Sequence, residues 1–394
     1  MTPAARVQAA IELLDQVIEA ARAGGAAADT LIARYFKDRR YAGSKDRRAV
    51  RELVYRAIRR SGERPPSGRA AMLGVATDQP ELLALFSGAP HGPAPIAEGE
   101  AGAPPGVVPE WLQSRLDPLV GPHEWPPLLE RAPLDLRVNR LRGDCDQAQA
   151  LLPEASPSPL SPLGLRLPEG FRVEESEAWA SGLVEVQDEG SQLLALTCQA
   201  APGSLIVDLC AGAGGKTLAL AAEMGNQGRI VASDTDRGRL SRMRPRLDRA
   251  GVSIVEPRLL DPGKEREALA DLAGRADLVL VDAPCSGSGT WRRNPETRWR
   301  LTPDRLERLV ALQAHLLGIA AELVRPGGLL VYAVCSLLAE EGRAQADAFG
   351  RSRSAWVDLP VAISGGRQAG AGRLLSPGHD GTDGFFVARW QAPC

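Results

Sequence analysis

The sequence predicts an α/β protein in which a parallel, doubly wound sheet follows a helical N-terminal region. From about residue 182 onward, short apolar runs alternate with segments of helical periodicity. These runs lack the polar alternation of a half-exposed sheet, which is typical of parallel strands buried on both faces. Residues 4–60 instead repeat apolar side chains at helical spacing, so we expect the chain to begin with helices.

Composition indicates a soluble protein with more than one domain. The chain has 394 residues, of which 44% are hydrophobic and 24% charged, and its net charge is −2. No apolar run is long enough to span a membrane, and the N-terminus lacks a signal-peptide core. The six cysteines form no C-x-x-C pair and the four histidines are scattered, which argues against a metal site. We therefore expect a cytoplasmic protein with reduced thiols and no membrane contact.

Changes in composition divide the chain into four expected parts. These are a helical domain at 1–88, a Pro/Gly/Ala linker at 89–106, a small α/β module at 107–181 and the main domain at 182–394. Many arginines lie within 39–60 of the helical domain. They are consistent with a solvated helix face and with a phosphate-binding face.

The main domain is expected to contain six strands with helices between them. The strands are LIVDLC at 205–210, GRIVASD at 228–234, VSIVEPRLLD at 252–261, ADLVLVDAP at 276–284, GGLLVYAVCS at 327–336 and GFFVARW at 384–390. The longest expected helix begins at Pro303 with Thr302 as its cap. A shorter helix contains Pro245, which marks either its start or a kink. Ligands of such sheets bind at the carboxyl ends of the strands.

A glycine-rich loop follows the first of these strands. The stretch VDLCAGAGGKT, Val207 to Thr217, resembles a triphosphate-binding loop, but that motif requires glycine where Cys210 stands. The glycines still let the backbone approach a ligand closely, and the following helix N-terminus attracts an anion. Asp234 and Asp261 end the next two strands, where they can bind ribose hydroxyls and an adenine amino group. A dinucleotide and S-adenosylmethionine both fit this pattern.

Two cysteines lie at the ends of the fourth and fifth strands. Asp282 and Cys285 follow the fourth strand, and Cys335 follows the fifth. Neighbouring strands lie about 4.8 Å apart, so we expect two thiols and a carboxylate to converge beside the cofactor. This set suits methylation of carbon 5 of a pyrimidine, in which a thiolate adds to carbon 6 and activates carbon 5. The spacing alone does not decide which cysteine is the nucleophile.

Several spaced motifs resemble one enzyme family. DLCAGAGGKT, DAPCSGSGTWRRNP, YAVCS and PGHDGTDGFF are similar to the RsmB/Sun-type (NOL/NOP/Sun) RNA cytosine-5 methyltransferases, as is VQDEGSQLLA before them. The resemblance covers about 182–390, and the N-terminal helices resemble the NusB-like RNA-binding domain of bacterial ribosomal RNA members. It implies a Rossmann-type methyltransferase domain, S-adenosylmethionine as cofactor and RNA as partner. The implied substrate is a cytosine of 16S ribosomal RNA, with transfer RNA as the alternative.

The resemblance also implies roles for individual residues. Cys335 would be the nucleophile, Cys285 would assist release of the methylated RNA, and Asp282 would lie between cofactor and cytosine. Lys216 would lie near the reacting groups without an assigned role. The residues implied to bind the cofactor are Cys210, Ala211, Gly212, Ala213, Gly214, Gly215, Lys216, Asp234, Asp261 and Asp282.

Two positions depart from the family pattern. Gly212 and Ala213 stand where the family commonly has Ala-Pro, which loosens the loop but keeps its backbone donors. Val334 stands before Cys335 where the family commonly has threonine, so the hydroxyl beside the nucleophile is lost.

The stretch after Cys285 alternates cations with aromatic side chains. This composition suits phosphate contact and base stacking, and a structural loop with exposed arginines is the alternative. The expected RNA-contacting residues are Arg292, Arg293, Asn294 and Arg298, with Trp291 and Trp299 between or beside them. The terminal motif, with His379, Asp380, Asp383 and Phe385, is expected to shape the wall of the site.

Two other classes of function remain compatible with parts of the pattern. A dehydrogenase would use the glycine loop and a strand-end acid but gives no reason for two cysteines. A non-catalytic RNA-binding ribosome assembly factor would keep only the fold. We expect a monomer.

Overall fold

The computed structural model describes residues 1–394, which form two compact units. The first unit contains 1–116, 121–130 and 290–303, and the second contains 117–120, 131–289 and 304–394. The segment 290–303 thus belongs with the N-terminal helices although it follows Cys285 in sequence. None of the helices combines the length and apolarity that a membrane crossing requires.

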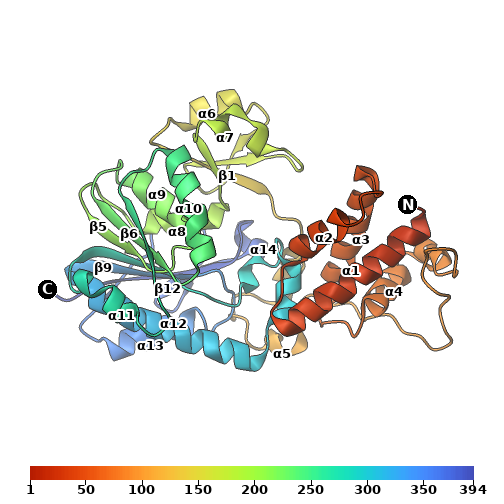
Figure 1. Cartoon of the computed structure of the whole chain (residues 1–394). Coiled ribbons are helices and arrows are strands. Elements are labelled where there is room, and N and C mark those ends of the chain that lie inside the picture. Colours follow the sequence, from red (N-terminus) through yellow and green to blue (C-terminus); the bar gives the residue numbers. More distant parts are fainter. The chain divides into compact units, whose positions relative to one another are not determined.

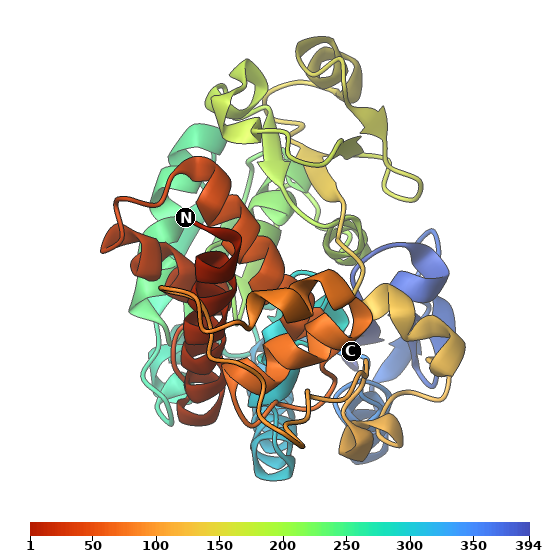
Figure 2. The same cartoon turned by 90° about the vertical axis from the view of Figure 1, so that its right-hand side faces the viewer.

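The first unit is helical. Its main helices are α1 (Pro3–Ala23), α2 (Ala28–Lys37), α3 (Ser44–Arg60) and α4 (Gly68–Asp78), drawn in red to orange in Figures 1 and 2. α1 begins where the Thr2 hydroxyl accepts a hydrogen bond from the Ala5 N–H, and it ends at Gly24 with φ 70°. Short turns follow at η1 (Pro80–Leu85), α5 (Glu110–Gln113), η2 (Pro122–Glu124) and η3 (Pro126–Leu128). The apolar faces of α1 to α4 form one core.

The stretch expected to be a linker is instead packed against α4. Arg69 of α4 forms an ion pair with Glu100 at 2.5 Å, and the Ala103 N–H donates to the Ala70 carbonyl at 2.8 Å. A Cβ on Gly102 would lie 2.5 Å from the Gly74 nitrogen, so this close approach requires glycine. Residues 89–106 therefore belong to the helical unit.

The second unit contains a small antiparallel sheet with the order β2-β3-β1-β4. Its strands are β1 (Leu134–Val138), β2 (Ser156–Pro157), β3 (Gly164–Leu167) and β4 (Val184–Val186), with helices α6 (Cys145–Leu151) and α7 (Glu177–Ala180). A capping box between Asp144 and Gln147 starts α6. The expected small module is thus present, but it begins near residue 131 and includes β4, beyond the expected end at 181.

The large sheet has nine strands in the order β11-β12-β13-β9-β8-β5-β6-β7, with β10 also paired to β13. They are β5 (Leu205–Asp208), β6 (Arg229–Asp234), β7 (Val255–Leu259), β8 (Ala276–Asp282), β9 (Val324–Val334), β10 (Val357–Leu359), β11 (Arg367–Ala369), β12 (Gly372–Leu375) and β13 (Phe385–Gln391). β5 to β9 are parallel, as the apolar runs predicted. β10 to β13 pair antiparallel, which those runs did not indicate.

Helices cover both faces of the large sheet. Apolar side chains of α8 (Glu189–Thr197), α9 (Gly215–Glu223) and α10 (Arg237–Ala250) join those of β5, β6, β8, β9 and β13 in one core. The opposite face carries α12 (Pro303–Leu323) and α13 (Arg343–Ser352), as Figure 1 shows. There the Phe349 and Trp390 rings lie 4.6 Å apart. α11 (Glu265–Ala268) and α14 (Pro377–Asp380) are short, and Pro245 lies inside α10. Because β5, β6, β8 and β9 are parallel, their carboxyl ends lie at the same edge of the sheet.

Candidate active site

The glycine loop joins β5 to α9. Gly212 and Gly214 have φ of 57° and 83°, in the left-handed region that favours glycine. A Cβ on Gly214 would lie 2.7 Å from the Met243 side chain, whereas a Cβ on Gly212 would meet no atom within 4 Å. The Thr217 hydroxyl donates to the buried Asp208 carboxylate at 2.7 Å, which ties the start of α9 to the end of β5. The loop therefore turns tightly on one side and presents its backbone to open space on the other.

Asp234, at the end of β6, fixes the same loop. One carboxylate oxygen accepts from the Gly212 N–H at 2.9 Å, and the other accepts from the Asp236 N–H at 2.7 Å. Asp261 is exposed after β7, next to Leu260, whose N–H donates to the Asp234 carbonyl. The structure thus places the glycine loop and both acids at the carboxyl edge of β5, β6 and β7. The arrangement fits a nucleoside with an anionic tail, because backbone donors and carboxylates lie along one edge.

Lys216 and Asp282 form an ion pair beside this loop. The Lys216 ammonium lies 2.7 Å from the Asp282 carboxylate and 5.6 Å from the centre of the Phe385 ring. Burial lowers the pKa of Lys216, but the charge and hydrogen bond of Asp282, together with Cys335 and Asp208, outweigh it and raise this pKa. Lys216 therefore stays protonated, and its charge interacts with Cys335.

The two cysteines meet at the ends of neighbouring strands. Cys285 follows β8 and Cys335 follows β9, and their Sγ atoms lie 3.3 Å apart in hydrogen-bonding contact. The hydrogen bond to Cys335, burial and the charges of Cys335 and Glu341 raise the pKa of the Cys285 thiol well above its usual value. Cys285 is therefore held as a thiol.

A buried carboxylate that the sequence analysis did not single out lies behind the cysteines. Glu341, in the turn between β9 and α13, has no exposed surface and accepts a hydrogen bond from the Ser286 N–H at 2.8 Å. It also accepts from the Ser336 hydroxyl at 2.6 Å and from Gln313 of α12 at 3.0 Å. The sequence offers no signal for this role, because adjacent Glu340 and Glu341 look alike and Gln313 lies mid-helix.

The expectation that Arg298 contacts RNA is corrected by its placement. Only 1% of Arg298 is exposed, and its guanidinium donates to the Ile58 and Ser61 carbonyls at 2.5 and 2.8 Å. The Trp299 indole also donates to the Ser61 carbonyl, and its ring joins the core of the helical unit. Both side chains therefore hold the segment 290–303 against α3 instead of facing a ligand.

The other expected RNA contacts divide by exposure. Trp291 and Arg292 are buried, with only 1% and 6% of their surfaces exposed. This burial excludes base stacking on Trp291 in this conformation. Arg293 is half-buried and Asn294 is exposed. Of the expected residues, these two remain placed for an RNA contact.

The terminal motif acts as a support near the loop. The Asp380 carboxylate accepts from the Gly366 and Ser376 N–H groups at 2.7 and 2.9 Å. The Asp383 N–H donates to Asp188 at 3.1 Å, and Phe385 lies under Lys216. His379 contacts Asp380 at 3.0 Å, and 44% of its side chain is exposed.

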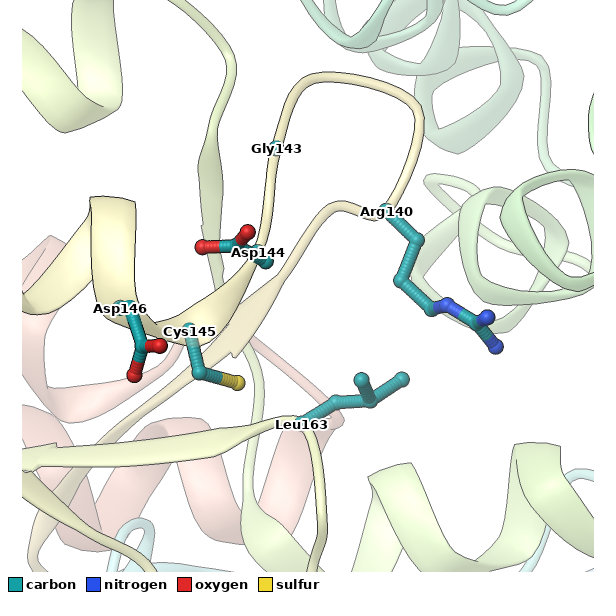
Figure 3. A pocket seen from close by; sticks show the side chains of 6 residues that line it. All are labelled: Arg140, Gly143, Asp144, Cys145, Asp146 and Leu163. Atoms are coloured by element: carbon teal, nitrogen blue, oxygen red, sulfur yellow. The ribbon is translucent and has the colours of Figure 1, made fainter.

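A separate cavity of about 550 Å³ lies in the small antiparallel module. Figure 3 shows Arg140 on one side of it and Asp144 and Asp146 on the other. It is lined by Arg140, Gly143, Asp144, Cys145, Asp146 and Leu163. None of these residues belongs to the site that contains Cys285 and Cys335.

The strand order and the glycine loop define a Rossmann-type methyltransferase domain, and comparison with known proteins gives the family. Residues 195–391 match the family described as 16S rRNA methyltransferase RsmB/F, and the chain belongs to this family. It is 34% identical over 299 residues to the probable ribosomal RNA small subunit methyltransferase B of Synechocystis sp., covering 71% of this chain and 66% of that protein. It is 36% identical over 289 residues to ribosomal RNA small subunit methyltransferase B of Klebsiella pneumoniae, covering 71% and 65%. The matched part thus spans about two thirds of these relatives' length.

Solved structures share the fold. PH0851 superposes with a TM-score of 0.76 at 23% identity and covers 99% of both chains. A methyltransferase homolog protein from Pyrococcus horikoshii gives a TM-score of 0.59 at 28% identity, covering 68% of this chain and 90% of that one. The predicted family and the Rossmann-type fold with a helical N-terminal part are therefore confirmed. S-adenosylmethionine, the predicted cofactor, is likewise confirmed for a member of this family.

Proposed function

We propose that this protein transfers a methyl group from S-adenosylmethionine to carbon 5 of a cytosine in RNA, and that its substrate is 16S ribosomal RNA. The observation that carries the proposal is the contact of two thiols, 3.3 Å apart, beside the Lys216–Asp282 ion pair. A dehydrogenase or a bare RNA-binding module has no use for this arrangement. The relatives named as small-subunit ribosomal RNA methyltransferases support the choice of RNA.

The strand-end residues would hold the cofactor. The backbone donors of the loop from Cys210 to Gly215 would bind its methionine end at the start of α9. Asp234 would accept hydrogen bonds from the ribose, and Asp261 would face the adenine side. When bound, S-adenosylmethionine supplies an electrophilic methyl group.

Cys335 would be the nucleophile. Its thiolate forms a bond to carbon 6 of cytosine, and the ring electrons shift so that carbon 5 becomes nucleophilic. The Lys216 ammonium favours negative charge on Cys335, and Asp282 orients the polar edge of the cytosine. After methylation, a base removes the carbon 5 proton, and the electrons of that C–H bond re-form the double bond between carbons 5 and 6, which expels the Cys335 thiolate and restores the aromatic ring. Cys285, held as a thiol against Cys335, would assist this release.

Lys216 could also stabilise the Cys335 thiolate in place of the threonine that the family commonly has at position 334. Val334 is fully buried in β9 and pairs with Phe386 of β13, so no hydroxyl from this position supports the nucleophile. We infer that the buried Lys216 ammonium takes the larger share of thiolate stabilisation here.

Methyl transfer from labelled S-adenosylmethionine tests the function directly. The protein is incubated with 16S ribosomal RNA from a strain that lacks it, and bisulfite sequencing then locates the modified base. We expect label on a defined cytosine and none with Cys335→Ala. Label on transfer RNA alone would correct the substrate, and no label on any RNA would overturn the proposal.

A further inference from the structure

One buried carboxylate, that of Glu341, connects the segment after Cys285 with the segment after Cys335. Glu341 is completely buried, and its oxygens accept hydrogen bonds from Ser286, the residue after Cys285, and from Ser336, the residue after Cys335. These distances are 2.8 and 2.6 Å. A single side chain thus fixes both segments that carry the thiols.

Gln313 extends this support to the other side of Cys285. Its Nε2 donates to the Pro284 carbonyl at 2.9 Å and to Glu341 at 3.0 Å. The Tyr332 hydroxyl donates to the Glu341 backbone carbonyl at 2.6 Å, which anchors the turn itself to β9. Both neighbours of Cys285 are therefore held by one connected set of buried groups.

We propose that Glu341 is a positioning residue that holds the Cys285 and Cys335 thiols in contact. The inference rests on the proposed function for its catalytic meaning, but the thiol contact itself can be tested without RNA. A buried carboxylate with partners on both oxygens keeps its place, because breaking these hydrogen bonds leaves unsatisfied groups in the interior.

The same carboxylate adds to the rise in the pKa of the Cys285 thiol, after the hydrogen bond to Cys335, burial and the charge of Cys335. The titratable groups that face Cys285 are Cys335, Glu341 and Tyr332, and the first two raise the pKa of its thiol. Removing the Glu341 charge removes one of these contributions, so Cys285 should ionise at lower pH. Loss of the contact with Cys335 acts in the same direction.

The test compares Glu341→Gln and Glu341→Leu in the full-length protein. Glutamine keeps an oxygen for the Ser286 and Gln313 donors and loses the charge, whereas leucine loses both. Glu307→Gln is the matched control, because Glu307 is exposed on α12. Alkylation of each cysteine by iodoacetamide is followed across pH by peptide mass spectrometry, and circular dichroism checks folding.

We expect the alkylation profile of Cys285 to move to lower pH in both Glu341 variants and to stay unchanged in the control. Single-turnover methyl transfer should fall about 10- to 100-fold in Glu341→Leu and less in Glu341→Gln. An unchanged Cys285 profile in Glu341→Gln would overturn the inference, even if the leucine variant does not fold. Failure of methyl transfer in the wild type would instead count against the proposed function, since alkylation needs neither RNA nor cofactor.

Discussion

Cys285 and Cys335 have the same side chain, but their neighbours give the two thiols different electrostatic surroundings. Cys285 lies towards the buried Glu341 carboxylate, which adds to the rise of its pKa. Cys335 interacts electrostatically with the Lys216 ammonium, which Asp282 keeps charged against the cost of burial. A negative charge on one side and a positive charge on the other polarise the pair. This asymmetry supports the proposed roles, in which Cys335 attacks and Cys285 remains protonated.

Lys216→Met tests the positive side of this arrangement. Methionine fills a similar volume but leaves Asp282 without its ion-pair partner and Cys335 without a nearby cation. We expect methyl transfer to fall by roughly 100-fold, the usual loss when one electrostatic stabiliser is removed from an active site. Lys264→Met is the control, because Lys264 is exposed after β7. Equal single-turnover rates for the two variants would contradict a catalytic role of Lys216.

Asp208 makes stability depend on pH. Burial raises the pKa of its carboxyl to about 7, although the Thr217 hydroxyl opposes this rise. Because the folded pKa exceeds the unfolded one, the stabilising contribution of the protonated form is lost as pH rises through about 7. Each pKa unit corresponds to about 1.4 kcal/mol, so the loss is on the order of a few kcal/mol.

The Asp208→Asn variant should lack this component. We expect thermal unfolding of the wild type to shift downward from about pH 5 to about pH 8 more than that of the variant. The two proteins are compared by calorimetry in matched buffers. Parallel temperature shifts in both would show that Asp208 is not the group responsible.

At the level of elements, the segment 290–303 has a structural use that its composition conceals. A stretch of arginine and tryptophan is typical of RNA contact, but Arg298 and Trp299 bind backbone carbonyls at the end of α3. The carbonyls at a helix C-terminus lack partners within the helix, and a guanidinium with several donors satisfies them well. The same residue types thus serve either purpose, and only the fold distinguishes them.

Trp299→Ala tests this use. Removing a fully packed tryptophan should lower the free energy of unfolding by about 3–5 kcal/mol. Hydrogen exchange should report loss of protection in α1 and α3, whose side chains surround the ring. Trp111→Ala, at a half-buried position of the same unit, is the control and should cost less. If the amide hydrogens of α3 in Trp299→Ala exchange as slowly as in the wild type, the segment 290–303 is dispensable for the helical core.

For the whole molecule, the sequence could predict the parts that follow local rules. Parallel strands from apolar runs, the glycine loop and the cysteines at adjacent strand ends all follow from residue type and order. The antiparallel direction of β13 did not follow, because a buried strand has the same apolar pattern in either direction. The packing of 89–106 and the bracing by Glu341 depend on contacts distant in sequence, which composition does not encode.

The chain passes from the second unit back into the first shortly after Cys285. Only 286–289 separate Cys285 from the segment that completes the helical unit.

The central claim is that Cys335 attacks the base and Cys285 permits release, and trapping of the covalent intermediate tests it most directly. Cys335→Ala and Cys285→Ala are each incubated with S-adenosylmethionine and 16S ribosomal RNA, and denaturing gels reveal protein bound covalently to RNA. We expect a stable complex with Cys285→Ala, and neither complex nor methylation with Cys335→Ala. A stable complex with Cys335→Ala instead would reverse the two roles.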